Sequence, residues 1–241
     1  MLSEHSLIFP GETPNRSLNR CLFSRYQDFL YTLRHFTDGE FYNRLVKTCS
    51  IEPVVLREML ERADKIGHVK YEKREKCKIT EGGIEYNIFW FAVQDRFNIR
   101  SIVPSKFKIY DMPYNEEAIK LLMANISNGN SQKNSCYKAH RRSNLRDSLT
   151  KYLDILRYLK KQKDGNSIYN LVNKTSIPYD KLKPLKKHAL SIGHIEFDKE
   201  KKSKKGDPFI KIGEEGLHLL NAVNWLVTKC DLEDYVPSQV G

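Results

Sequence analysis

Lysines are the residues with the clearest chemical potential in this sequence, and they fall into two clusters. One occupies residues 179–187 (YDKLKPLKK) and the other residues 199–205 (KEKKSKK). A lysine ammonium binds phosphate as a point charge and can contact guanine, although it lacks the planar fork of arginine. These clusters therefore favour the binding of a polyanion, with affinity stronger than sequence specificity.

The excess positive charge of the chain is concentrated around these clusters. The 241 residues carry a net charge of +11, and residues 129–211 alone hold 21 Lys and Arg against 8 Asp and Glu. A localised basic surface is typical of phosphate binding, because each neutralised phosphate releases a condensed counterion. The alternative is a solvated charged surface that only keeps the protein in solution.

Periodic apolar residues indicate the elements that position the lysines. Residues 152–159 carry an apolar stripe at helical spacing, a short segment SIYNLVNKT follows, and a third helix is predicted from about residue 179. The alternating stretches HIEFDK and FIKI predict a hairpin whose tip is the second lysine cluster, and a closing helix begins at Glu214. Three helices followed by such a hairpin and a helix are the plan of a winged helix-turn-helix.

In the third helix of this plan, the core face and the solvent face separate by residue type. Leu182, Leu185 and Ala189 are expected to point to the core. Pro184 is expected to kink the helix at a cost of about 3 kcal/mol, less if the helix begins near Tyr179 or Asp180 so that the proline lies close to the first turn.

The same pattern occurs twice in the chain. A shift of 126 positions aligns residues 26–73 with residues 152–199 without a gap, and 16 of the 48 aligned pairs are identical. Beyond that stretch Ile79 aligns best with Ile212, which makes the second hairpin loop seven residues longer. Self-similarity at a fixed offset indicates a duplicated domain.

The predicted fold class is therefore mostly α with small β-hairpins (α+β), built as tandem duplicated winged helix-turn-helix domains. The boundaries expected for its parts are a flexible arm at 1–20, repeat 1 at 21–95, a connecting segment with a helix and a basic linker at 96–147, repeat 2 at 148–230, and a tail at 231–241.

Repeat 1 differs from repeat 2 in charge. Its third helix, expected near residues 52–65 with Ser50 as a cap, has a net charge of −1, and its hairpin tip is short. Carboxylates facing phosphates are repelled, so we expect repeat 1 to contact a partner or form a dimer, with Arg57 and Arg62 leaving a minor DNA role open.

The predicted DNA-binding residues belong to the third helix of repeat 2, to its hairpin and to the linker before it. They are Tyr179, Lys181, Lys183, Lys186, Lys187, Lys199, Lys201, Lys202, Lys204, Lys205, Arg141 and Arg142. The neighbouring Lys138 and Arg146 extend the linker patch, for which backbone contact and simple solvation are equally good interpretations.

Other chemistry finds little support. His68 and His194 occupy equivalent positions of the two repeats, where flanking a strand is a simpler role than metal binding or pH sensing. Cys136 and His140 lack a second pair of ligands for zinc, and five scattered cysteines form no disulfide framework. We find no nucleotide-binding or metalloprotease motif, so we expect no catalytic residues, no cofactor and no metal. The expected location is cytoplasmic and nucleoid-associated, without a membrane span.

Repeat 2 resembles the archaeal winged-helix transcriptional regulators. The stretches that carry the resemblance are DILRYLKKQKDG, LVNKTSIPYDKLKPLKKHALSIGHIEFD and IGEEGLHLL, within residues 151–227 and more loosely 26–93. The sequence departs from the family at His194, where leucine is usual, and at Pro184. The resemblance implies a DNA-binding regulator of transcription.

The expected partner is double-stranded DNA. A homodimer could form through Leu217, Leu220, Val223 and Leu226 of the closing helix, or through repeat 1. Two alternatives come from other classes of protein: a tandem winged-helix scaffold that binds only proteins, and a replication initiator of plasmid or viral type.

Overall fold

A computed structural model describes residues 20–71, 76–105, 116–127, 146–162, 164–202 and 208–236. This part is mostly helical, with two small antiparallel two-stranded sheets, which confirms the α+β class at that level. None of the helices in these ranges has the length and hydropathy needed to cross a bilayer. The side chains of residues 199, 200 and 202 fall outside the description, as does the arm at 1–19.

The same order of elements occurs twice, as the repeated sequence predicts. In repeat 1 the elements are α1 (Leu22–Arg34), α2 (Tyr42–Cys49), α3 (Pro53–Lys65), β1 (Val69–Lys70), β2 (Lys78–Ile79) and α4 (Glu81–Arg96). In repeat 2 they are α6 (Ser148–Lys161), α7 (Ile168–Thr175), α8 (Tyr179–Ser191), β3 (Ile195–Lys202), β4 (Pro208–Ile212) and α9 (Glu214–Lys229). The helix expected in the connecting segment is α5 (Glu116–Ser127).

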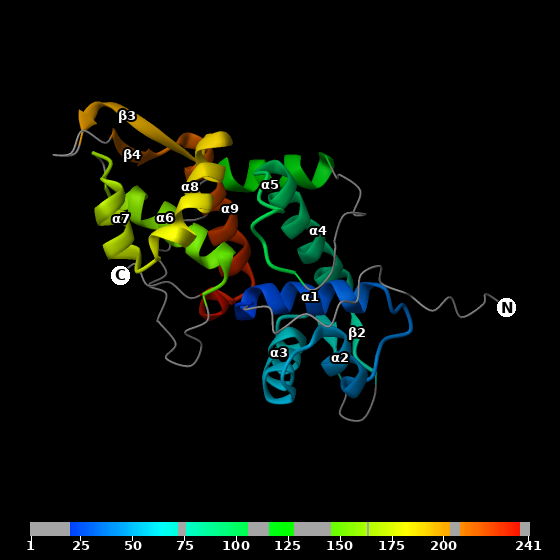
Figure 1. Ribbon diagram of the computed structural model, residues 1–241. Coiled ribbons are helices and arrows are strands. Elements are labelled where there is room, and N and C mark those ends of the chain that lie inside the picture. The colour runs from blue at the N-terminus through cyan, green and yellow to red at the C-terminus, as the bar shows by residue number, and fades with distance from the viewer. Residues whose placement is uncertain are drawn as a thin grey trace.

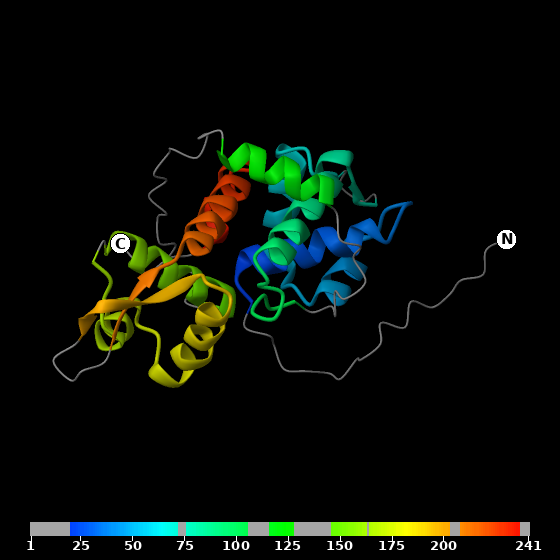
Figure 2. The same ribbon diagram turned by 90° about the horizontal axis from the view of Figure 1, so that it is seen from above.

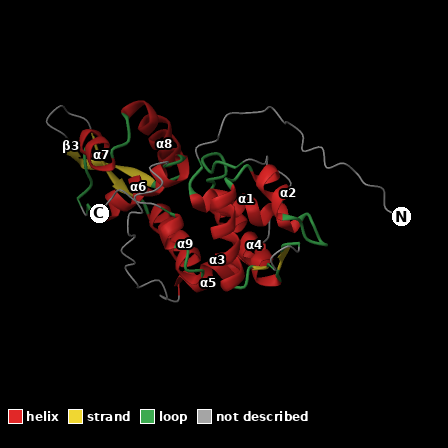
Figure 3. Cartoon of the chain, turned by 90° about the horizontal axis from the view of Figure 1, so that it is seen from below, coloured by secondary structure: helices red, strands yellow, loops and turns green. Residues whose placement is uncertain are grey.

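The repeats lie against each other, with repeat 1 at the lower right of Figure 1 and repeat 2 at the upper left. The helix α5 packs against the closing helices α4 and α9, an arrangement visible from above in Figure 2. The hairpin β3–β4 and the helix α2 lie toward opposite ends of the molecule (Figure 3). One continuous cluster of buried apolar side chains spans both repeats.

The closing helices α4 and α9 contact each other across the two repeats. The ring of Phe89 on α4 meets Trp225 on α9 edge-on, with 5.7 Å between centroids. On the same helices, Arg96 donates two hydrogen bonds to the carboxylate of Glu215, at 2.9 and 3.0 Å. A helix that is apolar on most sides needs burial on more than one side, and α4 obtains it from α1, α5 and α9.

The hairpins differ in length as expected. In repeat 2, Ile195 pairs with Ile212 and Phe197 with Ile210 before the register shifts toward the tip. In repeat 1 only Val69–Ile79 and Lys70–Lys78 pair. An additional bridge joins each hairpin to its own first loop, Glu40 to Cys77 and Asn166 to Ile210, at equivalent positions of the repeats.

Several boundaries differ from the sequence expectation. Arg20, assigned to the arm, is buried in the fold, and the tail after residue 230 is part of the core through Leu232 and Val236. The predicted cap Ser50 is wrong: Ser50 ends α2 in the left-handed conformation (φ 49°), and α3 begins after Glu52 without a side-chain cap.

The closing helix α9 does not offer the predicted dimer contact. Leu220, Val223 and Leu226 are each only 1% exposed, because they pack inside the chain, and Leu217 is half-buried. The expectation that these residues face a second copy is therefore wrong for the three buried ones.

Candidate nucleic-acid interface

The helix α8 carries the first lysine cluster and is positioned by three buried side chains. Leu182, Leu185 and Ala189 face the core, which confirms the predicted inner face. The helix begins at Tyr179, after Pro178 at its N-cap. The left-handed Ser176 (φ 51°) and buried Ile177 turn the chain from α7 into this helix.

Pro184 lies inside α8, and the helix continues through it. Proline has no N–H to donate to the carbonyl of Asp180, so one backbone hydrogen bond of the helix is missing there. Because α8 begins at Tyr179, the proline falls in the second turn of the helix, close to the end where backbone N–H groups have no helical partner.

The outward face of α8 presents the predicted residues to solvent. Lys181, Lys183 and Lys187 are exposed, Lys186 is half-buried, and the ring of Tyr179 is 55% exposed. Lys181 lies 3.5 Å from the carboxylate of its neighbour Asp180. Within the described ranges, no carboxylate forms an ion pair with Lys183, Lys186 or Lys187, so their charge is available to an external anion.

The hairpin of repeat 2 contributes less than the sequence suggests, as far as it is described. Lys201 forms an ion pair with Asp164 at 2.7 Å, which ties the hairpin to the loop between α6 and α7. Lys199 and Lys202 belong to β3 by their backbone. Lys204, Lys205, Arg141 and Arg142 lie outside the described residues, as do Lys138 and the Cys136–His140 pair.

Arg146 of the predicted linker patch has a structural position instead. Its guanidinium donates to the carboxylate of Asp154 (2.9 Å) and to the backbone carbonyls of Thr175 (2.7 Å) and Ser176 (3.0 Å). It therefore satisfies carbonyls at the end of α7 and holds the turn that leads into α8. We call Arg146, with these three partners, the arginine clamp of repeat 2.

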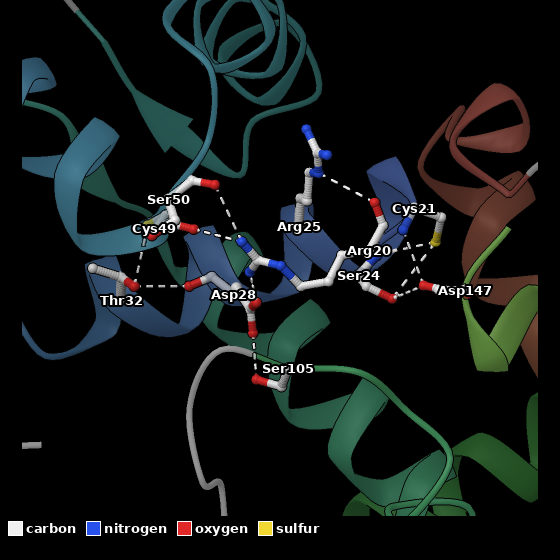
Figure 4. Close-up of polar contacts among 10 residues, drawn as sticks. All are labelled: Arg20, Cys21, Ser24, Arg25, Asp28, Thr32, Cys49, Ser50, Ser105 and Asp147. Carbon is white, nitrogen blue, oxygen red and sulfur yellow. Dashed lines mark hydrogen bonds and ion pairs between the residues drawn. The ribbon is translucent and has the colours of Figure 1, made fainter. Parts of the chain in front are cut away.

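Repeat 1 contains the same clamp. Arg20 forms an ion pair with buried Asp28 and donates to the carbonyls of Cys49 (2.8 Å) and Ser50 (3.3 Å), as Figure 4 shows. Arg20 and Arg146 differ by 126 positions, the offset of the duplication. The sequence does not predict the clamps, although the equivalent positions of the two arginines in the duplication could have indicated a shared structural role.

The equivalent face of repeat 1 has different chemistry. At the offset of 126, Lys183 and Lys187 correspond to Arg57 and Glu61 on α3, and Asp180 corresponds to Val54, which is 68% exposed. Arg62, for which the sequence leaves a minor DNA role open, forms an ion pair within the chain, with its guanidinium 2.5 Å from the carboxylate of Asp234. These contacts and substitutions leave α3 without a lysine face.

The two equivalent histidines form buried pairs with two equivalent tyrosines. The hydroxyl of Tyr26 lies 2.8 Å from Nδ1 of His68, and that of Tyr152 lies 2.7 Å from Nδ1 of His194. Burial lowers the pKa of each histidine to about 4. Both rings are therefore neutral at pH 7 and join the first helix of each repeat to its hairpin.

A metal role for these histidines finds no support in the geometry. Among the described residues, no group of three or more His, Cys, Asp or Glu side chains is placed to hold a metal ion. Each histidine instead pairs with a buried tyrosine of its own repeat.

Comparison with known proteins adds no assignment: no protein-family model, no curated protein and no solved structure matches this chain.

Proposed function

We propose that this protein binds duplex DNA through the lysine face of α8, and that each repeat is a winged helix-turn-helix. The observation that supports the proposal best is the state of Lys183 and Lys187. They lie one turn apart on the outer side of α8, both exposed and neither paired with a described carboxylate. A helix that carries unpaired cations on its exposed side fits the major groove, where phosphates line both edges.

The proposal assigns two roles to the residues of repeat 2. The lysines neutralise phosphates and supply most of the affinity, whereas Tyr179, at the first position of the helix, reaches the base edges. The hairpin β3–β4 lies beside α8 and extends the contact along the backbone. Arginine is the residue that most often reads guanine, and α8 has none, so we expect modest sequence specificity.

Binding to duplex DNA across a salt series tests the proposal. The variant Lys183→Ala/Lys187→Ala removes two phosphate contacts, so the slope of log K against log salt should become shallower by about 1.8. The matched control is Arg57→Ala/Lys65→Ala, which removes the same charge from exposed positions of α3. Its slope should equal that of the wild type.

Two results would refute the proposal. One is the absence of salt-dependent binding at low ionic strength. The other is an equal loss of slope in the two double variants, which would indicate that net charge alone attracts the DNA.

Within this function we propose a role in the regulation of transcription, which the resemblance of repeat 2 to archaeal winged-helix regulators supports. Mapping of the bound sites in the genome of origin distinguishes the alternatives. Occupancy of promoters would support a regulator, whereas occupancy restricted to repeated sites at a replication origin would replace it with an initiator.

A further inference from the structure

The two repeats contact each other reciprocally through the segments that follow their closing helices. We call residues 97–105 the first crossing segment and residues 230–236 the second crossing segment. In the first, the carbonyl of Asn98 accepts a hydrogen bond from Nε2 of His188 on α8, at 3.0 Å. In the second, Asp231 and Asp234 bind Arg62 on α3, at 3.7 and 2.5 Å.

These two contacts occupy equivalent positions. Arg62 and His188 differ by the offset of 126, and Asn98 and Asp231 differ by 133, which is 126 plus the seven residues of the longer hairpin loop. Asn98 and Asp231 also share the left-handed conformation, with φ 48° and 50°. Each crossing segment therefore leaves its helix by the same turn and docks on the third helix of the other repeat.

A second reciprocal pair lies deeper in the core. The thiol of Cys230 lies 3.5 Å from Nε2 of His68, and the ring of Phe97 lies 6.1 Å from that of His194. Cys230 and Phe97 are again equivalent at an offset of 133. Each buried histidine is thus covered by the residue that follows the closing helix of the other repeat.

The helices α1 and α6 meet where their N-caps lie. Asp147 caps α6 by accepting from the N–H of Thr150 at 2.8 Å, and it also accepts from the N–H of Cys21 (3.0 Å) and the hydroxyl of Ser24 (2.7 Å). Cys21 is itself the cap of α1 and is equivalent to Asp147 (Figure 4). Equivalent residues that touch each other mark the position of an approximate two-fold axis.

Contacts in which residue x of one unit meets residue y of the other, and y meets x, define an isologous interface. Such an interface is ordinarily made by two identical subunits. Here both halves belong to one chain, so the surface that would hold a second copy is already buried, together with Leu220, Val223 and Leu226 of α9.

The two halves of this internal dimer offer different faces. Dimeric helix-turn-helix proteins bind inverted repeats because their two identical recognition helices each read a half-site of the same sequence. In this chain the lysines of α8 correspond to Arg57, Glu61 and other residues of α3, and the eight-residue strand β3 corresponds to the two-residue β1. The outer faces of α8 and α3 therefore cannot read two half-sites of the same sequence.

We infer that the protein binds DNA as a single chain on a non-palindromic site of one half-site, roughly one helical turn long. This inference rests on the proposed function and adds the class of DNA and the stoichiometry. Repeat 1 occupies the place of the second subunit, completes the core of repeat 2 through the first crossing segment, and leaves the second half-site unread.

In vitro selection tests the inference. The full-length protein is presented with a library of duplexes containing about 30 randomised base pairs, enough for two half-sites one turn apart. We expect one enriched motif without inverted symmetry. The mass of the complex on a duplex carrying one motif, measured by analytical ultracentrifugation, should correspond to one chain and one duplex.

A second measurement uses two motifs arranged as an inverted repeat, one helical turn apart. Two chains should bind them independently, with the affinity of the single site. Enrichment of an inverted repeat bound cooperatively by two chains would overturn the inference while leaving DNA binding intact. If the wild-type protein shows no salt-dependent binding to the starting library, the proposed function is refuted, and this inference is refuted with it.

Discussion

Replacement of Arg146 by methionine separates the structural role of this arginine from the DNA contact that its sequence context suggests. Methionine keeps the length and the apolar stem of the side chain but removes the charge and the donors. The change breaks the arginine clamp of repeat 2 and removes the closer ion pair, at 2.9 Å, of the fully buried Asp154, whose ion pair with the guanidinium of Arg157 at 3.5 Å remains.

The expected loss follows from the three contacts. Removal of one partner of a buried ion pair costs about 3–5 kcal/mol, because the remaining charge stays buried without its counterion. The remaining Arg157 and the exposed position of Ser176, where water can reach the carbonyl, place the value near the lower end, about 3 kcal/mol. With an m-value of about 2–3 kcal/mol per M of urea, the unfolding midpoint should fall by about 1–1.5 M.

Urea unfolding at pH 7, followed by circular dichroism, measures the midpoint. Arg20→Met is the matched variant, because Arg20 has the equivalent partners in repeat 1, and it should lose a similar amount. Under conditions where Arg146→Met is folded, its salt dependence of DNA binding should equal that of the wild type. A midpoint shift below about 0.3 M together with a slope shallower by about 0.9 would refute the clamp and return Arg146 to the DNA backbone.

Three further predictions concern the histidines, the interface and a glycine. The pKa of His68 and of His194 is about 4 in the folded protein, below the ordinary value of about 6.5, so the unfolded chain takes up protons first as the pH is lowered. The free energy of unfolding should therefore fall by about 1.4 kcal/mol per pH unit for each histidine as the pH is lowered from about 6 to about 4.5. Urea midpoints across this range measure the slope, and a His68→Gln variant with the wild-type slope would contradict the assignment. Arg62→Ala should lower the stability by about 1–2 kcal/mol, because it releases the second crossing segment, with no change in the salt slope of DNA binding; a shallower slope would place Arg62 on DNA. Gly216→Ala should lower the stability by about 2 kcal/mol or more, because a Cβ there would lie 2.2 Å from the carbonyl oxygen of His194. Gly193→Ala should lower the stability by about 1 kcal/mol, because a Cβ there meets open space and only the φ of +74° is unfavourable. Equal thermal midpoints for the two variants would refute the close contact at Gly216.

The order of elements could be predicted because local periodicity and the duplication carry it. The inner face of α8 follows from Leu182, Leu185 and Ala189 at helical spacing, and the exposed lysines follow from the same geometry. The predicted start of α8 near Tyr179 is confirmed, and it places Pro184 in the second turn, just beyond the first turn in which proline is best tolerated.

The pairing of charges could not be predicted, because it depends on which segments meet in three dimensions. Arg62 and Asp234 lie far apart in sequence, and no periodic pattern relates them. Lys201 similarly finds Asp164 only after the hairpin packs beside the loop between α6 and α7. The crossing segments were assigned to a connecting segment and a tail because short irregular stretches carry no periodic signal.

The reciprocal interface has a consequence for how the two repeats can diverge. Some equivalent positions hold the same residue in both repeats, such as Tyr26 and Tyr152 or His68 and His194. These residues are buried, and each contacts residues of the other repeat or of its own repeat's hairpin region. On the outer faces, the equivalent pairs Arg57–Lys183 and Glu61–Lys187 are exposed and differ in residue type. A mutation in the shared core affects the stability of both repeats, whereas a mutation on an outer face changes the surface of one repeat alone. Selection can therefore preserve a common scaffold while one face keeps an ancestral task and the other is free to acquire a new one.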